Sequence, residues 1–450
     1  MSRRFLLFIT LALSLLSCGE EPDDDRGIAK KPADTGAARA DSRVEDVRSD
    51  GPRTLPPPAL NRPLHLSPRV ITLAETNHLT KEKEFILNVP VGFNIGVAAE
   101  GMNRVRFMAM SPDDRLFATD MIDLSDNRKG KVYVLDGFDP ATKRFATRSV
   151  YLDGLRNPNS IAFLTDDAGK NWIYVAQTDK LIRYPYMPGE MRPQGTPQTL
   201  ATFPDSGRGY REGGWHLTRT VLAAPNGKIY VAVGSSCNVC VEKEEVRATI
   251  VEMNPDGSGQ RIYARGLRNA VGLRWVENGL WATNMGADHL GLDAPVDNLY
   301  AVVDGRHYGW PYVYETTKGV LTRDPSYGKD SNAVAPASVP PSWARIPAHA
   351  APLGLEWFGA ASDPSLRNTF LVALHGSGAP AMKRGYSVAR YGEGGKKLGD
   401  FINGFQVGTK RFGRPCDILR VDDDSFFLSD DHAGVIYYVY REPEPGDGGA

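Results

Sequence analysis

The chain has 450 residues, of which 41% are hydrophobic and 24% are charged, and its formal net charge is −1. This balance is typical of a soluble globular protein with one large core or two domains, and it offers no basic surface for nucleic acid. The 46 glycines and 32 prolines, with only short apolar runs between them, predict many turns and strands and little helix.

The N-terminus has the features of an export signal. Residues 1–17 contain two arginines and then an apolar run from Phe5 to Leu16, which is too short for a dedicated membrane span. The run ends in Leu-Leu-Ser-Cys, which resembles a bacterial lipobox, so we expect Cys18 to be lipidated. The alternative is an ordinary cleaved signal with an incidental cysteine. The expected location is the bacterial cell envelope, with the anchored protein on the periplasmic side of the outer membrane.

The segment that follows differs in composition from the rest of the chain. Residues 18–66 are charged and rich in proline, with almost no aromatic side chains, so they cannot bury enough apolar surface to fold. We expect a disordered linker here and a short disordered tail over residues 443–450. Residues 67–442 are predicted to form the folded part.

One hairpin motif recurs six times along the folded part. An apolar strand, a turn rich in Pro, Asp, Asn or Gly, and a strand of aliphatic and aromatic residues follow one another in each copy. The copies begin at Phe107, Ile161, Val221, Val271, Leu353 and Ile418, and a third strand follows each. Self-similarity with several strands per unit predicts an all-β, six-bladed β-propeller, whereas a β-sandwich gives no reason for six related units. We expect the run from Phe93 to Gly101 to pair with the last unit and close the ring.

This fold predicts where charged residues meet. The loops that lead into the innermost strands gather around the axis of a propeller, and residues ahead of the repeats include Arg106, His216, Arg268, Asn269 and Arg414. Converging arginines are costly to bury unless an anionic ligand compensates them. The alternative is that each arginine pairs with a nearby carboxylate.

The chain resembles a known family from about Val89 to Arg441. The strings "GGWHLTRTVLAAPNGKIYVAVGSSCNVC", "GLRNAVGLRW", "GRHYGWPYVY", "VALHGS" and "GRPCDIL" occur in order. They resemble the soluble quinoprotein glucose/sorbosone dehydrogenases, which are six-bladed propellers that use pyrroloquinoline quinone (PQQ) and calcium.

The resemblance implies specific roles. His216 would be the general base that takes a proton from the sugar hydroxyl. The implied cofactor contacts are Arg106, Arg268, Asn269, His375 and Arg414. Calcium would be held by Gly286 and Ala287, with a second calcium position at Asn298 and Tyr308. PQQ carries three carboxylates, which suit guanidinium partners, and a neutral histidine suits proton removal.

Three segments depart from the pattern of the family. The sequence after His375 lacks the tryptophan of many relatives, and Asn298 stands where they carry a carboxylate. Soluble glucose dehydrogenases place an aspartate behind the base histidine, but the corresponding "GSSC" at 234–237 contains no carboxylate. His216 is therefore held by another group or is less basic.

The cysteines require a separate interpretation. Cys237 and Cys240 form a Cys-x-x-Cys pair in a chain with an export signal, which favours a small loop-closing disulfide. Zinc would need two more ligands, and Val241 stands where a haem motif needs histidine. A redox-active dithiol is the alternative. Cys416 is expected to be buried and free.

Together these features predict a PQQ- and calcium-dependent dehydrogenase that oxidises an aldose or related sugar. Hydride would go to PQQ and the proton to His216, and electrons would pass to a quinone or a soluble carrier. One alternative is a non-catalytic binding module of the envelope, and another is a calcium-dependent lactonase on a similar propeller.

Overall fold

A computed structural model describes residues 59–205, 215–327 and 333–442, which belong to one compact unit. The predicted signal peptide, Cys18, most of the predicted linker and the predicted tail lie outside the described residues. Within the described ranges, no helix has the length and apolar character needed to cross a membrane.

Six antiparallel four-stranded sheets make up most of the fold. The first sheet contains β4 (Val105–Met110), β5 (Leu116–Asp120), β6 (Gly130–Asp139) and β7 (Arg144–Leu155). The second contains β8 (Ser160–Thr165), β9 (Asn171–Ala176), β10 (Lys180–Tyr186) and β11 (Gln198–Thr202). The third contains β12 (Arg219–Ala223), β13 (Ile229–Val233), β14 (Thr249–Met253) and β15 (Arg261–Arg265).

The remaining sheets repeat this order, except that the outer strand of the fourth and of the sixth sheet does not directly follow the third strand in the numbering. The fourth contains β16 (Ala270–Val276), β17 (Gly279–Asn284), β18 (Asp297–Val302) and β21 (Ala344–Ile346). The fifth contains β22 (Pro352–Trp357), β23 (Phe370–Leu374), β24 (Ser387–Tyr391) and β25 (Lys397–Ile402). The sixth contains β28 (Pro415–Arg420), β29 (Phe426–Asp430), β30 (Val435–Arg441) and, as its outer strand, β3 (Phe93–Ala99).

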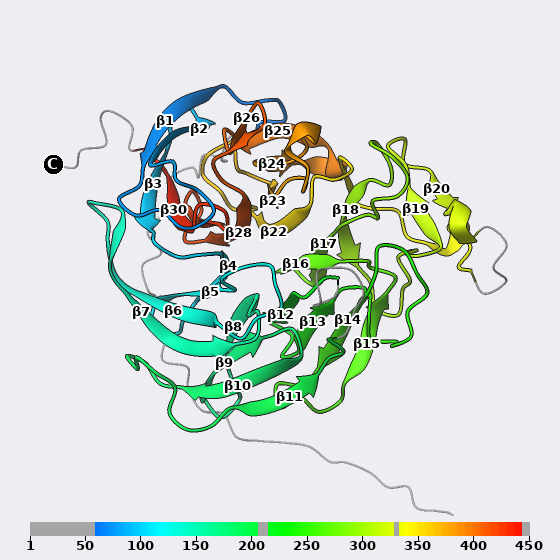
Figure 1. The fold of residues 1–450 in the computed structure, drawn as a ribbon, viewed down its shortest axis with the longest axis horizontal. Coiled ribbons are helices and arrows are strands. Elements are labelled where there is room, and N and C mark those ends of the chain that lie inside the picture. Colours follow the sequence, from blue (N-terminus) through cyan, green and yellow to red (C-terminus); the bar gives the residue numbers. More distant parts are fainter. Residues whose placement is uncertain (1–58, 206–214, 328–332, 443–450) are drawn as a thin grey trace, which may run out of the picture. The chain divides into compact units, whose positions relative to one another are not determined.

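The sheets form a closed ring. Figure 1 shows them around a common centre with β4, β8, β12, β16, β22 and β28 innermost, and each of these strands contacts the next, including β28 with β4. The predicted six-bladed propeller is confirmed. The pairing of β3 with β30, from Phe93 opposite Arg441 to Ala99 opposite Ile436, also confirms the predicted closure of the ring.

The local turn chemistry explains why the hairpins form where they do. In the third sheet, Pro225-Asn226-Gly227 joins β12 to β13, and Gly227 has a φ of +75°, which an L side chain adopts only with strain. Gly227 donates to the carbonyl of Ala224, which closes the turn. The strand after this turn, β13, is buried along its whole length, because both faces of the sheet pack against neighbouring sheets.

Hydrophobic clusters lie between each pair of adjacent sheets, so that the core is divided among the six interfaces. A separate small cluster lies on the inner strands. It consists of Phe107, Val271, Leu353 and Cys416, with Met285 packed against it. Val271, Leu353 and Met285 also line the cavity described below.

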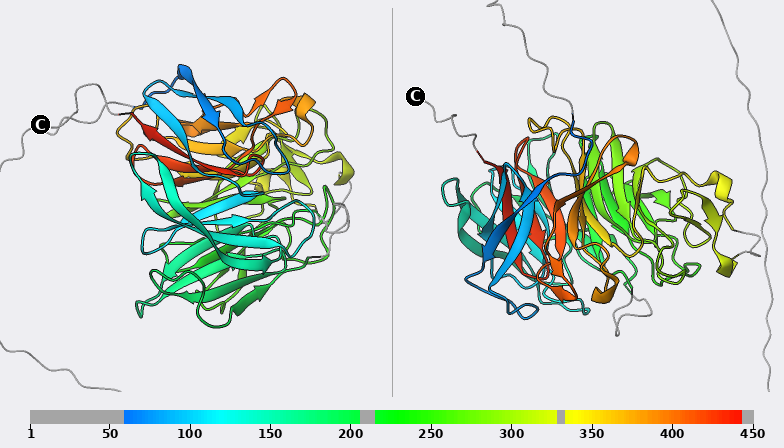
Figure 2. Two further views of the ribbon diagram at one scale, coloured as in Figure 1. Left: turned by 60° about the vertical axis from the view of Figure 1, so that its left-hand side comes forward. Right: turned by 90° about the horizontal axis from the view of Figure 1, so that it is seen from above.

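In the part of the chain that the structure describes, three hairpins and four short 3-10 helices lie outside the six sheets. The hairpins are β1 (Leu66–Thr72) with β2 (Glu84–Pro90), β19 (Val313–Glu315) with β20 (Leu321–Arg323), and β26 (Gln406–Val407) with β27 (Lys410–Arg411). The 3-10 helices are η1 (Pro325–Tyr327), η2 (Pro336–Ser338), η3 (Pro380–Met382) and η4 (Glu393–Gly395). The β19–β20 hairpin interrupts the fourth sheet between β18 and β21, and Figure 2 shows it in yellow at the side of the propeller.

Candidate active site

A cavity of about 270 Å³ lies where the segments flanking several inner strands meet. Its lining includes most of the residues singled out in the sequence: Arg106, His216, Arg268, Asn269, Gly286, His375 and Arg414. Ala287, Asn298 and Tyr308 instead line an adjoining cavity of about 30 Å³, which shares Arg268 and Gly286 with the first. The structure therefore brings the predicted base and the predicted cofactor contacts together, and it separates three of the predicted calcium residues from them.

His216 lies three residues ahead of β12 and is held on both sides. Its backbone has a φ of +52°, and Arg219 donates from Nη1 to the carbonyls of His216 (2.7 Å) and Thr218 (2.9 Å). Its ring atom Nδ1 lies 3.0 Å from both the carbonyl oxygen and the Oγ of Ser235. The backbone of His216 is thus fixed by an arginine and its imidazole by a serine.

These contacts define the tautomer of His216. The Oγ of Ser235 donates its own proton to the carbonyl of Cys237 at 2.7 Å, so both oxygens that face Nδ1 act as acceptors. Nδ1 must therefore carry the proton, which leaves a lone pair on Nε2. No group in the described part of the chain hydrogen-bonds to Nε2. Ser235, in the "GSSC" segment, takes the place behind the histidine where the family has an aspartate.

The protonation state of His216 follows from its surroundings. Burial, and then the positive charge of Arg268, lowers the pKa of His216 well below 6.5. The imidazole is therefore neutral at neutral pH and can accept a proton at Nε2.

Gly234, directly ahead of Ser235, allows His216 and Asn269 to approach each other. A Cβ at this position would lie 2.6 Å from both the Cβ of His216 and the Oδ1 of Asn269. Glycine is required here by close approach, because real Cβ atoms essentially never come so near to other atoms.

Arg268 precedes β16 and its guanidinium is anchored on three sides. Nε and Nη2 donate to the carbonyl oxygen and the Oδ1 of Asn238, both at 2.9 Å, and Nη1 donates to the carbonyl of Gly286 at 2.8 Å. Nη2 also lies 3.3 Å from Asp288, whose side chain is half exposed. The guanidinium carbon is 5.8 Å from the ring centre of Trp215.

Arg414 precedes β28 and is buried without an ion pair. Its Nε donates to the carbonyl of His375 at 3.0 Å, and its Nη2 donates to the carbonyl of Gly376. Among the described residues, no carboxylate lies within 4 Å of its guanidinium. Burial lowers the pKa of Arg414. A buried cation that has only carbonyl partners favours a nearby anion.

Asp431, which the sequence analysis did not single out, neutralises part of the predicted cluster. It is fully buried directly after β29, and it lies 3.0 Å from Arg104, 2.7 Å from Arg106 and 2.7 Å from the Nε2 of His375. Burial alone would raise the pKa of Asp431, but His375, Arg104 and Arg106 hold it well below 3.8. For Arg106, the alternative of a local carboxylate partner is therefore the correct one.

His375 is uncharged in this arrangement. Burial, and then the charge of Arg414, lowers the pKa of His375 to about 3, although Asp431 opposes the shift. The neutral ring donates its Nε2 proton to Asp431. The motif "FFLSDD" held a signal for this cluster, because acidic residues at the end of an apolar buried strand need cationic partners.

The predicted calcium residues have oxygen and nitrogen partners within the protein. The carbonyl of Gly286 accepts from Arg268, and its amide donates to Asp297 at 2.8 Å. Asp297 also accepts from the amide of Ala351 at 2.9 Å, it lines the main cavity, and burial raises its pKa to about 7. Gly286 and Asp297 thus place two oxygen donors, a carbonyl and a carboxylate, at one wall of the cavity.

The smaller cavity contains two acids that the sequence analysis missed. Glu315 and Asp324 both line it and are both buried. Asn298 donates to Glu315 at 3.2 Å, and Asp324 lies 2.8 Å from the Nε2 of His289. The hydroxyl of Tyr308 bonds to the backbone of β18, accepting from Val303 and donating to Ala301. Most of these oxygens are engaged by the protein, but the buried Oε1 of Glu315 accepts no hydrogen bond among the described residues and has only Arg345 nearby, at 3.5 Å. The predicted second calcium position at Asn298 and Tyr308 stays a prediction.

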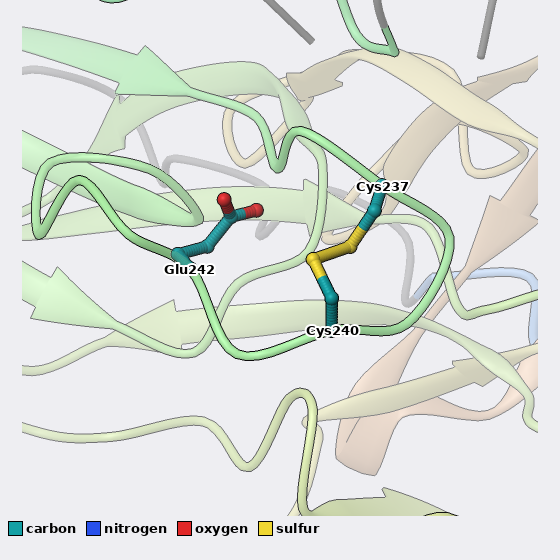
Figure 3. A group of neighbouring side chains, drawn as sticks. All are labelled: Cys237, Cys240 and Glu242. Atoms are coloured by element: carbon teal, nitrogen blue, oxygen red, sulfur yellow. A yellow bond between two sulfur atoms is a disulfide. The ribbon is translucent and has the colours of Figure 1, made fainter. Parts of the chain in front are cut away.

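The cysteines pair in the way favoured by their spacing. Cys237 and Cys240 form a disulfide in the loop that follows β13, and Figure 3 shows Glu242 beside it. The ligand atoms of these three residues lie within 4.8 Å of one another. Glu242 accepts from the amide and the Oγ of Ser236, both at 2.6 Å. Cys416 is buried and free, and burial raises the pKa of its thiol.

Comparison with solved structures shows the same fold elsewhere. The calcium structure of the family AA12 enzyme of Trichoderma reesei gives a TM-score of 0.63 at 16% identity, covering 79% of this chain and 96% of that chain. The holo form of the pyranose dehydrogenase PQQ domain of Coprinopsis cinerea gives 0.61 at 19% identity, covering 82% and 100%. The PQQ-bound aldose sugar dehydrogenase of Streptomyces coelicolor gives 0.54 at 18% identity, covering 78% and 99%.

Sequence comparison gives a relative and a family. An uncharacterised protein of Borreliella burgdorferi is 30% identical over 227 residues. The match covers 48% of this chain and 58% of the length of that relative. The family model described as TrAA12-like matches residues 87–399, well over half of the chain. The chain therefore belongs to the TrAA12-like family, which confirms the resemblance to the soluble quinoprotein sugar dehydrogenases that its motifs indicated.

Proposed function

We propose that this protein is a PQQ- and calcium-dependent dehydrogenase that oxidises an aldose or a related sugar at a carbon bearing a hydroxyl group. One observation carries the proposal. A neutral histidine with an available Nε2 faces the same cavity as two anchored guanidinium groups, one of which has no carboxylate partner among the described residues. The pyranose dehydrogenase domain and the aldose sugar dehydrogenase among the similar structures are supporting analogies.

The cavity residues fit a planar tricarboxylate. Arg414 supplies a buried positive charge that donates to two carbonyls and lies over the ring of Tyr386, and Arg268 supplies a second guanidinium beside Trp215. Guanidinium groups bind carboxylates through paired hydrogen bonds and stack on flat rings. Arg106 contributes less charge to such a ligand than its sequence position indicates, because Asp431 neutralises it.

A hard cation at the wall beside Gly286 would have to replace the hydrogen bonds that its oxygens now accept from Arg268 and from the amides of Gly286 and Ala351. The carbonyl of Gly286 and the carboxylate of Asp297 are the kinds of oxygen ligand that calcium prefers. When bound, PQQ would supply a two-electron acceptor for the hydride that leaves the sugar carbon.

The remaining chemistry belongs to the side chains of this chain. The Nε2 of His216 would take the proton of the sugar hydroxyl, while Ser235 holds the Nδ1 proton and so keeps Nε2 available. Asn269, packed against Gly234, would fix one side of the ligand pocket. The products would be a lactone or acid, and the electrons would pass to a quinone or a soluble carrier.

We also propose that the enzyme works at the periplasmic side of the outer membrane. The support is the sequence alone, namely the basic and apolar residues 1–17 and the following Cys18. A single acyl chain binds a membrane only reversibly, so stable anchoring needs a second lipid or a basic patch.

The non-catalytic binding module is the second candidate. It is favoured by one observation: within the protein itself, Asp431 neutralises Arg106 and accepts a hydrogen bond from the neutral ring of His375. The lactonase would need a central cation held by several carboxylates, but arginine and histidine outnumber acids in the cavity lining.

A turnover assay separates these functions. The purified chain is loaded with PQQ and calcium, and dye reduction is followed with a panel of aldoses. Sugar-dependent dye reduction that requires PQQ is the expected result. Saturable PQQ binding with no turnover on any sugar would favour the binding module, and lactone hydrolysis without PQQ would favour the lactonase.

A further inference from the structure

We propose that residues 235–240, the loop closed by the Cys237–Cys240 disulfide, are the positioning element of the cavity. This loop orients both the imidazole of His216 and the guanidinium of Arg268, and it depends on the disulfide to do so. The inference rests on the proposed function, because His216 is the base and Arg268 a cofactor contact only if that function is correct. Its contacts are independent of any bound ligand.

The first contact is to the histidine. Ser235 places two acceptors against the Nδ1 of His216, and its hydroxyl is itself oriented by the carbonyl of Cys237. The disulfide residue Cys237 therefore acts on the imidazole through a single intervening side chain. If the carbonyl of Cys237 moves, the Oγ of Ser235 can rotate and donate to Nδ1. This donation would compete with the hydrogen bond from Nδ1 to the Ser235 carbonyl and so raise the share of imidazole that carries its proton on Nε2.

The second contact is to the arginine. Asn238 lies between the two cysteines, and its carbonyl and Oδ1 accept two of the N–H groups of Arg268. The same two oxygens also accept from the indole of Trp310 at 3.2 Å and the amide of Asp288 at 2.9 Å. Asn238 thus ties the guanidinium to two other segments around the cavity.

The backbone joins the two contacts. The amide of Ser235 donates to the carbonyl of Arg268 at 2.8 Å. Residues 235–240 form no strand, so sheet pairing does not fix them. In addition to the hydrogen bonds of Ser235 and Asn238 described above, the loop is held by the disulfide, which Figure 3 shows, and by Glu242, which accepts from Ser236. Opening the disulfide releases Asn238 from a closed ring of residues and restores the freedom of its backbone.

The alternative that Cys237, Cys240 and Glu242 bind a metal ion explains the structure of this loop less well than the disulfide does. Cys237, Cys240 and Glu242 lie close enough together to hold an ion, but both sulfur atoms are used in the disulfide and Glu242 is engaged by Ser236.

The first experiment uses the protein without PQQ. Nitrogen-15 NMR of labelled histidine reports which ring nitrogen carries the proton, and loss of one signal in His216→Gln assigns it among the eight histidines. The oxidised wild type is expected to show the proton on Nδ1 of His216. The double variant Cys237→Ser/Cys240→Ser is expected to show a mixture of tautomers. Val241→Ala, at an exposed position directly after the loop, is expected to match wild type.

The second experiment separates the two contacts. Asn238→Ala is expected to weaken PQQ binding about tenfold, the size of effect expected when a hydrogen bond to a charged group is lost, with the His216 signal unchanged. Ser235→Ala is expected to lower kcat and to leave PQQ affinity within about twofold of wild type. The double cysteine variant should show both effects.

Reduction of the wild type covers the case in which the double variant fails to fold. A dithiol reductant gives two electrons and two protons to the disulfide, which yields two thiols and the oxidised reductant. The NMR and affinity changes should then appear in the wild type. The folded single variants Asn238→Ala and Ser235→Ala test the same contacts without reduction.

The outcomes distinguish this proposal from the proposed function. If wild type binds no PQQ, the function fails, and the His216 tautomer in oxidised and reduced protein still decides the role of the loop. The proposal is overturned if opening the disulfide changes neither the tautomer nor, where PQQ binds, its affinity.

Discussion

Asp431 is the residue on which the charge balance of the site depends. Arg104, Arg106 and His375 all lie within 3.0 Å of it, and all four side chains are buried. A buried charge left without its partner is strongly destabilising, whereas exposed ion pairs contribute little.

We therefore predict that Asp431→Asn lowers the free energy of unfolding by about 3–5 kcal/mol, because two buried arginines lose their shared anion. Urea unfolding of the wild type and the variant measures this. The matched control is Asp423→Asn, since Asp423 is half exposed and 3.9 Å from Arg420. A loss for Asp431→Asn no larger than that of the control would show that Asp431 does not hold the cluster together.

His216→Gln tests the proposed base. We expect kcat to fall about 10²–10⁴-fold, which is the usual contribution of a positioned general base, while PQQ affinity stays near that of wild type. Steady-state dye reduction and a PQQ titration measure the two quantities. His65→Gln, an exposed histidine outside the cavity, serves as the control. Full activity in His216→Gln would assign proton removal to another group.

The pH dependence of kcat/KM gives an independent check. Burial lowers the pKa of His216 most. The positive charges of Arg268, Arg219 and Arg247 lower it further, and the hydrogen bond to the Ser235 backbone opposes them, so that the pKa lies well below 6.5. The imidazole stays unprotonated as pH falls through 6.5, so the acid limb of kcat/KM should lie well below that value. The same lowered pKa means that the unfolded chain binds the proton first, so this stabilisation is present above pH 6.5 and lost as pH falls. An acid limb at or above pH 6.5, measured at saturating calcium, would contradict this account.

At this scale, the sequence predicted which residues would meet but not how they would be neutralised. Arg106, His216, Arg268 and Arg414 stand at related places ahead of inner strands, so the repeat alone brought them together. Asp431 and Ser235 bind partners that are more than 15 residues away in the sequence. No local sequence pattern shows that such residues come into contact. The sequence predicted that another group holds His216 or that it is less basic, but it did not identify the group, and in the structure Ser235 lies against Nδ1.

The strands of the propeller follow from local signals, and the extra hairpins do not. The six repeated hairpins each combine a turn motif with two apolar strands, and all six are present in the structure. The β1–β2 and β19–β20 hairpins occur once each, so repetition gave no reason to expect them. The β1–β2 hairpin is attached to the fifth sheet by a bridge between Asn88 and Asn403.

The closing strand β3 is the element whose loss should matter most to the ring. Phe93 begins it, is fully buried, and packs edge to face on Phe401 with ring centres 5.1 Å apart. We predict that Phe93→Ala lowers the free energy of unfolding by about 3–5 kcal/mol, through lost burial and the cavity that remains. Denaturant unfolding measures this, with Val70→Ala as the control because Val70 is 62% exposed and its truncation should cost less than about 0.5 kcal/mol. Equal effects for the two variants would contradict a closing role for β3.

For the whole molecule, the ring explains how distant residues form one site. Arg106 and Arg414 are more than 300 positions apart in the chain, yet β4 and β28 are neighbours because β3 completes the sixth sheet. Under the proposed function, a carboxylate-bearing ligand would meet the charge of Arg414, and PQQ binding is the direct test of that proposal.

An equilibrium titration of the purified chain with PQQ in the presence of calcium is the decisive measurement, carried out on the wild type, Arg414→Gln and His216→Gln. We predict saturable binding to the wild type, a dissociation constant raised at least about tenfold in Arg414→Gln, and little change in His216→Gln. The account is contradicted if the wild type shows no saturable binding, or if Arg414→Gln binds PQQ as tightly as the wild type.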